Sequence, residues 1–591
     1  MFERFTRRIG ILVCLSLPLV LAPVLLGALE EMVGVEHQPE LPTHWKATRS
    51  VGKGAGPVTA AALLASGSSR VSWLQYHGDY RGLRHSPLES LEPNSVKDLQ
   101  VVWTLPTGTK GQFEVSPVIY DGVMYVTTSY NRLFALDAAS GEILWRYDHQ
   151  QPDDLRLCCG PPNRGVAIAG DRVFMATLDA KLLAFNRKTG DIDWEAVIID
   201  YALGYSSTGA PLVVGDRVFI GVGGGEFGIR GFFDAYNTKT GERLWRHYTV
   251  PGSGEPGVET WSGKSYEHGG APTWSTGVYD VDTNTLFWTT GNPSPDWNGD
   301  DRLGDNLFSD SLLAVDPETG ERKWHFQFTP HDLWDYDGNS HLFLVDLKLD
   351  GNLVKAIVQP NRNGYLYVLD RTNGEFLRAT PYLDQVNWAV IDEKGRPQVD
   401  PSRIPQDEPS ERICPGTLGG LNGAWTAAFN PDLGLAFVPS AEACIKFAKG
   451  IAIYAPGIPY LGGTPITVDI DAGEAWAHIL AIDLATGERR WSYRAPTMGG
   501  TLSTAGGVVI TGTLAGEALA LDAKTGERLW SFRMGAGVRS QPVAWEQDGR
   551  AYVAIGAGNL AGSNRWVGGP ESGSDGGILV VFALPEAEPK P

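Results

Sequence analysis

Two cysteines stand side by side in the stretch DLRLCCGPPNRG, which covers residues 154–165 of a 591-residue chain. These are Cys158 and Cys159, and Arg164 follows five positions after the second. A disulfide between neighbours closes a loop too small to constrain the unfolded chain, so it adds little to stability. The pair therefore indicates a role at a site and not a structural staple.

The N-terminus has the charge order of an exported protein. Three arginines within residues 1–8 precede 21 uncharged residues from Ile9 to Leu29, and two glutamates follow. This order holds the N-terminus in the cytoplasm and sends the rest of the chain across the membrane. Residues 1–31 are predicted to be a cleaved signal peptide or an inner-membrane anchor over residues 9–29. Either alternative places the body in the periplasm, behind a polar linker over residues 32–70.

Export gives the cysteines a second meaning, because disulfides persist outside the cytosol. Cys14 lies in the apolar N-terminal segment, so four of the five cysteines remain. The economical pairing is Cys158 with Cys159 and Cys414 with Cys444, and cross-pairing between the two sets is the alternative.

The composition restricts the fold and the partners. The chain has 72 Gly, 19 Trp and only 20% charged residues, which favours many short strands and turns. Its net charge of -20 argues against nucleic acid, which needs a basic patch. An acidic surface suits a cationic protein partner, or serves solubility alone.

An eleven-residue pattern recurs along the chain, as an apolar strand, a turn through Asp/Asn-x-x-Thr-Gly, and a second strand with Trp. Because each copy with its upstream hairpin makes a four-stranded unit, the spacing predicts an all-β, eight-bladed propeller. The repeated Trp is interpreted as a wedge between blades, without a catalytic role. The eight units are six clear copies at 135–145, 184–194, 235–245, 314–324, 481–491 and 520–530, a degenerate copy at 368–378, and a weak match near 427–440.

The repeat resembles the tryptophan-docking motif of the eight-bladed quinoprotein alcohol dehydrogenases of the methanol/ethanol type, which bind pyrroloquinoline quinone (PQQ). The resemblance runs from about Trp73 to about Leu584. It implies a propeller domain over residues 71–585 and a short tail over residues 586–591. Function must still be argued from the site, since propellers with similar repeats also serve as scaffolds.

The resemblance implies a cofactor pocket. In the family a disulfide between adjacent cysteines forms one wall, which Cys158 and Cys159 match, and an indole forms the other, which Trp274 matches. Two flat walls would fix a planar quinone in orientation. Positions that match the family's polar contacts to PQQ are Glu114, Arg164, Thr208, Arg362 and Asn422.

The resemblance also implies a metal site with oxygen ligands alone, from Glu226, Asn292, Asp335 and Asp337. Such ligands select hard cations. Asp337 resembles the aspartate of lanthanide-using relatives, where calcium-using relatives carry a small neutral residue. In a strand, residues two apart face the same side, so both aspartates could approach one ion. The alternative is a turn aspartate, solvated or bound to a neighbouring backbone N–H.

The implied reaction is oxidation of a primary alcohol. Asp335 would take the alcohol proton as general base, and hydride would pass to the quinone C5, polarised by the metal. Arg362 would stabilise the negative charge on the quinone oxygens. Because no C-x-x-C-H haem motif occurs, electrons would leave to an external c-type cytochrome. A monomer and a homodimer are both compatible with the sequence.

Other interpretations are weaker. GGGEFG (223–228) matches G-x-G-x-x-G but is followed by strand-like sequence, which excludes a dinucleotide site. His331 lacks a second histidine at metal-ligand spacing and is interpreted as a framework residue. The competing functions are a calcium-dependent dehydrogenase of polyols or sugars and a non-catalytic propeller scaffold.

Overall fold

The structure is a computed structural model that describes residues 56–466, 468–469, 473–497, 499–558 and 576–586, and the strand β1 (His44–Lys46). The predicted export segment, residues 1–31, lies outside the described residues. Across the described ranges, no helix combines the length and apolar character needed to cross a membrane. Within the predicted linker, the helix α3 (Ala60–Leu64) buries Leu63 against strands of the propeller.

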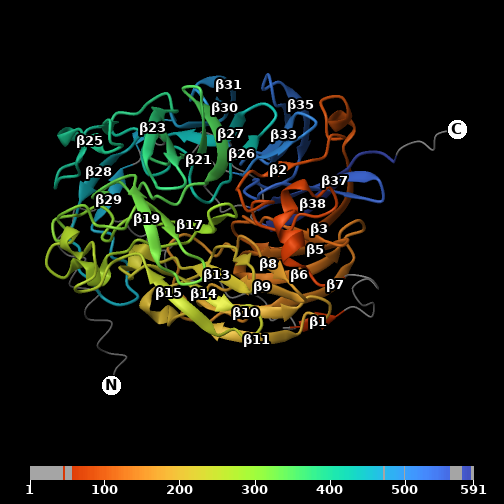
Figure 1. The fold of residues 1–591 in the computed structure, drawn as a ribbon, viewed down its shortest axis with the longest axis horizontal. Coiled ribbons are helices and arrows are strands. Elements are labelled where there is room, and N and C mark those ends of the chain that lie inside the picture. Colours follow the sequence, from red (N-terminus) through yellow and green to blue (C-terminus); the bar gives the residue numbers. More distant parts are fainter. Residues whose placement is uncertain are drawn as a thin grey trace.

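Eight antiparallel blades surround a central axis (Figure 1), which confirms the predicted fold class. The first four are β4 (Val118–Tyr120), β5 (Val123–Thr128), β6 (Arg132–Asp137) and β7 (Ile143–Asp148), with β1 added outside; β8 (Ala167–Ala169), β9 (Arg172–Ala176), β10 (Lys181–Asn186) and β11 (Ile192–Val197); β12 (Leu212–Val214), β13 (Arg217–Gly221), β14 (Phe232–Asn237) and β15 (Arg243–Tyr248); and β16 (Val278–Asp280), β17 (Thr285–Thr289), β18 (Ser311–Val315) and β19 (Arg322–Gln327).

The other four blades complete the ring. They are β20 (Phe343–Leu349), β21 (Asn352–Pro360), β22 (Tyr365–Asp370) and β23 (Phe376–Pro381); β26 (Ala428–Asn430), β27 (Leu435–Glu442), β30 (Trp476–Asp483) and β31 (Arg489–Arg494); β32 (Leu502–Thr504), β33 (Val508–Gly512), β34 (Glu517–Asp522) and β35 (Arg528–Arg533), with the short β2 (His85–Ser86); and β36 (Val543–Gln547), β37 (Arg550–Ala557) and β38 (Gly576–Ala583), with β3 (Gln100–Lys110).

The ring is closed by strands from the two ends of the chain. The early strand β3 pairs antiparallel with the last strand, β38, inside the eighth blade (Figure 1). Because this pairing joins the two ends of the chain in one blade, it holds the ring of blades closed.

The recurring pattern forms the turn and outer strand of a blade. In the first copy, Asp137 Oδ1 accepts hydrogen bonds from two turn N–H groups, and Gly141 has a positive φ of 75°. The ring of Trp145 then packs on Gly190 of the next copy, and its indole N–H donates to the Arg187 carbonyl at 3.0 Å. A Cβ at Gly190 would lie 2.7 Å from that ring, so the docking requires glycine. The structural interpretation of the repeated Trp is confirmed.

The predicted number of eight blades is right, but one of the eight sequence units was assigned to a blade of its own in error. The weak match near 427–440 forms β26 and β27, which pair with the strands of the copy at 481–491 in one blade. The eighth blade, β36–β38 with β3, contains no copy of the pattern. A long insertion between β27 and β30 separates the two halves of the sixth blade, which hid their connection.

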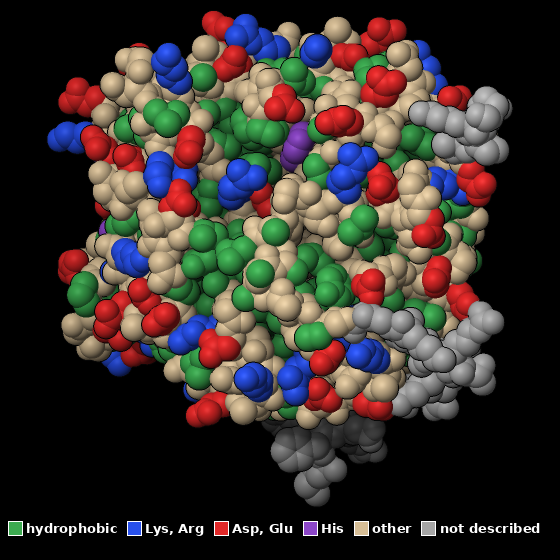
Figure 2. Space-filling view, turned by 45° about the vertical axis from the view of Figure 1, so that its right-hand side comes forward, with side chains coloured by type: hydrophobic (Ala, Val, Ile, Leu, Met, Phe, Trp, Pro, Cys, Tyr) green, Lys and Arg blue, Asp and Glu red, His purple; other side chains and the backbone are tan. Residues whose placement is uncertain are grey.

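Two small hairpins lie outside the blades. They are β24 (Ala389–Ile391) with β25 (Pro397–Val399), and β28 (Lys446–Lys449) with β29 (Gly463–Ile466). The second belongs to the insertion in the sixth blade, and the Cys414–Cys444 disulfide ties its base to the preceding segment. Acidic and basic side chains are interspersed on the face shown in Figure 2, around an apolar area.

Candidate active site

The predicted site residues lie in loops at one end of the inner strands. Glu114, Arg164, Thr208 and Trp274 each come three to four residues before the innermost strand of a blade, β4, β8, β12 and β16 respectively. Another group follows the second strand of a blade, which runs antiparallel and therefore ends at the same edge. This group consists of Glu226 after β13, Asn292 after β17 and Arg362 after β21.

The adjacent cysteines form a disulfide, and so do Cys414 and Cys444, which confirms the economical pairing. The Cys159 sulfur lies 3.6 Å from Glu226 Oε1 and is solvent-exposed. The disulfide thus stands at the edge of the site, next to the first of the predicted metal ligands.

Arg164 connects the predicted cofactor contacts. Its Nη2 lies 2.8 Å from Glu114 Oε2, and its Nη1 donates to Thr208 Oγ1 at 2.6 Å. The guanidinium carbon also lies 4.8 Å from the centroid of the Trp274 ring. Glu114 and Arg164 are 2% and 6% exposed, so this is a buried ion pair beside the predicted indole wall.

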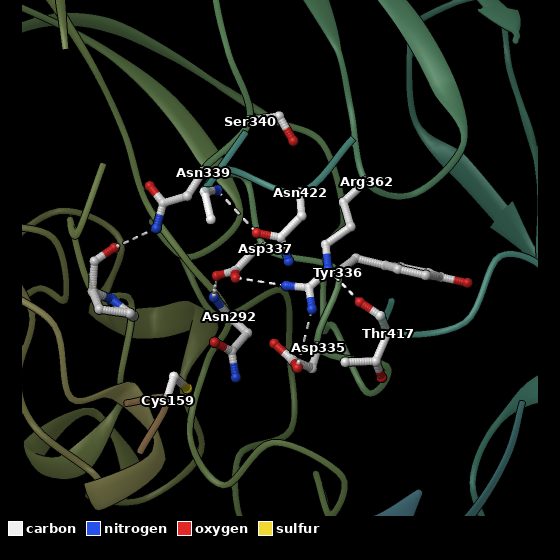
Figure 3. Close-up of polar contacts among 12 residues, drawn as sticks. Cys159, Asn292, Asp335, Tyr336, Asp337, Asn339, Ser340, Arg362, Thr417 and Asn422 are labelled. Carbon is white, nitrogen blue, oxygen red and sulfur yellow. Dashed lines mark hydrogen bonds and ion pairs between the residues drawn. The ribbon is translucent and has the colours of Figure 1, made fainter. Parts of the chain in front are cut away.

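A second group gathers around Arg362 (Figure 3). Its Nη1 lies 2.8 Å from Asp337 Oδ2 and its Nη2 lies 3.6 Å from Asp335 Oδ2. The Asn292 N–H donates to Asp337 Oδ1 at 3.1 Å. Asn422 lies in the same view, where its Oδ1 accepts from the Ala424 N–H at 2.9 Å.

The two aspartates share this group for a different reason from the one predicted. Residues 335–337 are not a strand, and both Asp335 and Asp337 have positive φ values, 56° and 53°. The alternation of a strand therefore does not place them. Gly291 gives Asp337 its place, since a Cβ at that position would lie 2.3 Å from Asp337 Oδ1.

Buried carboxylates surround these residues and repel one another. Burial raises the pKa of Glu226 to about 7, and the charge of Asp337 adds to the rise. Burial also raises the pKa of Asp335 well above its usual value, with Asp337 and Glu226 adding to this and Arg362 opposing it. Asp296 and Asp310 are raised well above their usual pKa for the same reasons. Both Asp310 side-chain oxygens are buried without a hydrogen-bond partner among the described residues.

The carboxylate oxygens of the predicted metal ligands do not form a close group of three. Among the described residues, Glu226 with the two disulfide sulfurs is the only group of three acidic, Cys or His ligand atoms within 4.8 Å of one another. Disulfide sulfur is not a thiolate, so this trio is no metal site. The acidic group itself is oxygen-only, buried and short of cations, which suits a hard cation. The residues present therefore fit such an ion in chemistry.

Comparisons with known proteins show which family the chain resembles. Residues 73–382 and 492–553 match the family described as "PQQ: Glucose/ethanol/alcohol dehydrogenase, beta-propeller domain". The chain belongs to the PQQ-dependent alcohol dehydrogenase family. Because its relatives are enzymes, the scaffold alternative is set aside.

Individual relatives within this family are similar over most of their length. The chain is 42% identical over 541 residues to "Quinoprotein alcohol dehydrogenase PedH" of Pseudomonas putida, covering 86% of this chain and 90% of that protein. It is 33% identical to a "Lanthanide-dependent methanol dehydrogenase" of Methylacidiphilum fumariolicum, covering 88% and 87%. A solved "Europium-containing methanol dehydrogenase" superposes with a TM-score of 0.82 at 32% identity, covering 89% of this chain and all of that one.

The sequence analysis did not predict several residues that lie at this candidate site. Asp332 accepts the backbone N–H groups of Trp334 and Tyr336 and so shapes the loop that carries Asp335. Its spacing in HDLWDYD is a signal that could have found it. Asp296, Asp310 and Arg539 gave no such signal, because each stands alone among small or apolar neighbours.

Proposed function

We propose that the protein is an exported, PQQ-dependent dehydrogenase of primary alcohols that uses a lanthanide ion in preference to calcium. The observation that carries the metal choice is the presence of two aspartates, Asp335 and Asp337, on one loop beside Glu226 and Asn292. An additional carboxylate raises the repulsion within the site, and a trivalent ion offsets it better than a divalent one.

The residues at one end of the site suit a planar, tricarboxylate cofactor. The disulfide and Trp274 supply flat walls, and Arg164 supplies a guanidinium that is already held by Glu114 and Thr208. Planar guanidinium groups bind carboxylates in two-point contacts. When bound, the metal and quinone together would supply the electrophile that accepts hydride from the alcohol carbon.

Asp335 is the proposed general base. Its side chain is 19% exposed, so a small alcohol can reach it. Arg362 lies 3.6 Å away and holds the carboxylate in place. A base needs contact with the proton that it takes, and this partial exposure at the edge of the acidic group provides it.

Export and the electron acceptor belong to the same proposal. Two disulfides in the described chain and the charge order of residues 1–31 support an oxidising compartment such as the periplasm. Electrons would pass to a separate cationic partner such as a c-type cytochrome, which the net charge of -20 suits.

A calcium enzyme is the second candidate, and one observation favours it. Asp337 already has the partners of a structural aspartate, since it accepts from the Asn292 N–H and contacts Arg362. Dye-linked alcohol oxidation by apo-protein with PQQ plus either calcium or a light lanthanide separates the two. Activity with the lanthanide alone supports the proposal, and activity with calcium alone assigns Asp337 to its loop. Absence of PQQ binding with both metals would contradict the enzyme.

A further inference from the structure

Arg539 lies beside Glu114, although no motif predicted it. It stands in the loop between β35 and β36, and backbone hydrogen bonds anchor that loop on both sides. The Val538 N–H donates to the Thr513 carbonyl at 2.9 Å, and the Gln541 N–H donates to the Val115 carbonyl at 2.9 Å. Because Val115 follows Glu114, this loop is fixed directly against the cofactor-binding end of the site.

The Arg539 side chain meets the Glu114–Arg164 pair from the other side. Its Nε lies 3.6 Å from Glu114 Oε1, while Arg164 Nη2 lies 2.8 Å from Glu114 Oε2. Each guanidinium therefore faces a different oxygen of one carboxylate, and Arg539 is only 7% exposed. Burial lowers the pKa of Arg539 and the charge of Arg164 lowers it further, while Glu114 opposes both.

Gln112 links this arrangement to the disulfide wall. With its amide turned to satisfy both neighbours, its oxygen accepts from Arg539 Nη1 at 3.2 Å and its nitrogen donates to the Cys159 carbonyl at 2.9 Å. Gly160 beside it has a positive φ of 84°, and a Cβ there would lie 2.7 Å from the end of the Gln112 amide. Through Gln112, Arg539 is thus connected to the disulfide on which the cofactor is proposed to stack.

Two buried donors in the same place have no acceptor among the described residues. These are Arg164 Nε and the Tyr76 hydroxyl, whose residues are 6% and 5% exposed. The hydroxyl feels the charges of both Arg164 and Glu114, so it lies beside the pair. Buried donors are nearly always satisfied in folded proteins, and an anionic ligand would satisfy these.

We propose that Arg539 binds a carboxylate of PQQ, as the second arm of a two-guanidinium clamp in which Glu114 holds both arms apart. This rests on the proposed function, because the cofactor must be PQQ for its carboxylate to be the ligand. Glu114 keeps the guanidinium groups oriented, and the two guanidinium groups supply the positive charge. A planar, bidentate donor is the group best matched to a carboxylate at this position.

The test is cofactor affinity, measured by fluorescence quenching as PQQ is titrated into metal-loaded apo-protein. Arg539→Gln should weaken PQQ binding by about 10- to 100-fold, as expected for the loss of a charged hydrogen bond. The PQQ affinity of Arg539→Lys should lie between those of the wild type and Arg539→Gln, because lysine keeps the charge but not the planar pair of donors. The matched control is Arg533→Gln, which removes an exposed arginine at the end of β35 in the same segment.

The outcomes distinguish this inference from the proposed function. If the wild-type protein does not bind PQQ, the proposed function fails first. If the wild type binds and Arg539→Gln binds equally well, the clamp is wrong while the enzyme stands. An unchanged melting temperature of the Arg539→Gln apo-protein, together with weaker PQQ binding, would exclude a merely structural role. If the Gln variant does not fold, equal affinity of the Lys variant and wild type overturns the bidentate contact.

Discussion

The two ends of the site differ in charge and in what they can bind. At one end, buried carboxylates repel one another, among them Glu226, Asp335 and Asp337. Arg362 is the cation that contacts both Asp335 and Asp337. At the other end, a single carboxylate, Glu114, lies between Arg164 and Arg539. One end thus has excess negative charge and suits a cation, while the other has excess positive charge and suits an anion.

This separation follows from the fold. Every blade supplies loops to the same edge of the ring, so carboxylates and guanidinium groups distant in sequence meet around one axis. Neither end would be favourable alone, because burying like charges costs free energy unless a ligand offsets it. A cofactor that carries carboxylates and also chelates a metal would neutralise both ends together. The predictions below test whether the two ends act separately.

The largest expected effect is on turnover at the acidic end. Asp335→Asn keeps the shape of the side chain but removes the proposed base, so kcat should fall by about 10²- to 10⁴-fold. PQQ affinity should change little, because the guanidinium end is intact. Steady-state kinetics and PQQ titration of the same variant check both halves of this expectation. A variant with near-normal turnover would show that another group takes the proton.

A smaller effect is expected on metal choice. Asp337→Ala removes one negative charge from the acidic end, so lanthanide affinity should fall by roughly 100-fold while calcium affinity falls less. The measurement is competition between terbium and calcium, followed by terbium luminescence. The control is Asp384→Ala, which removes an exposed carboxylate that does not belong to the acidic end. Equal losses for both ions would show that Asp337 does not discriminate between them.

The sequence predicted the ring and most of the guanidinium end, but not the acidic end in full. Gly and Trp recur at fixed places in the six clear copies, so the turns and the docking of each Trp on the next blade can be predicted from the sequence. Arg539 could not be predicted, because it contacts Glu114 from a loop more than 400 residues further along the chain. Asp335 and Asp337 lie together near Arg362, as predicted, but strand alternation was the wrong reason, since left-handed backbone places them.

The last comparison concerns pH in the metal-free protein. Burial raises the pKa of Glu226 to about 7 from an ordinary value of 4.5, so the folded protein holds a proton that the unfolded chain has lost. This contribution to stability is complete below about 4.5 and disappears as the pH rises through about 7.

We therefore expect urea unfolding to show that the apo-protein loses stability from pH 6 to 8, and that Glu226→Gln loses less. Buried histidines such as His77 and His341 have lowered pKa values and destabilise the fold below their ordinary pKa. That effect is common to both proteins, so it cancels in their difference. A hard cation should abolish the loss in the wild type, since it replaces the proton as the partner of the carboxylates. Parallel pH profiles for the two proteins would instead place the repulsion elsewhere than at Glu226.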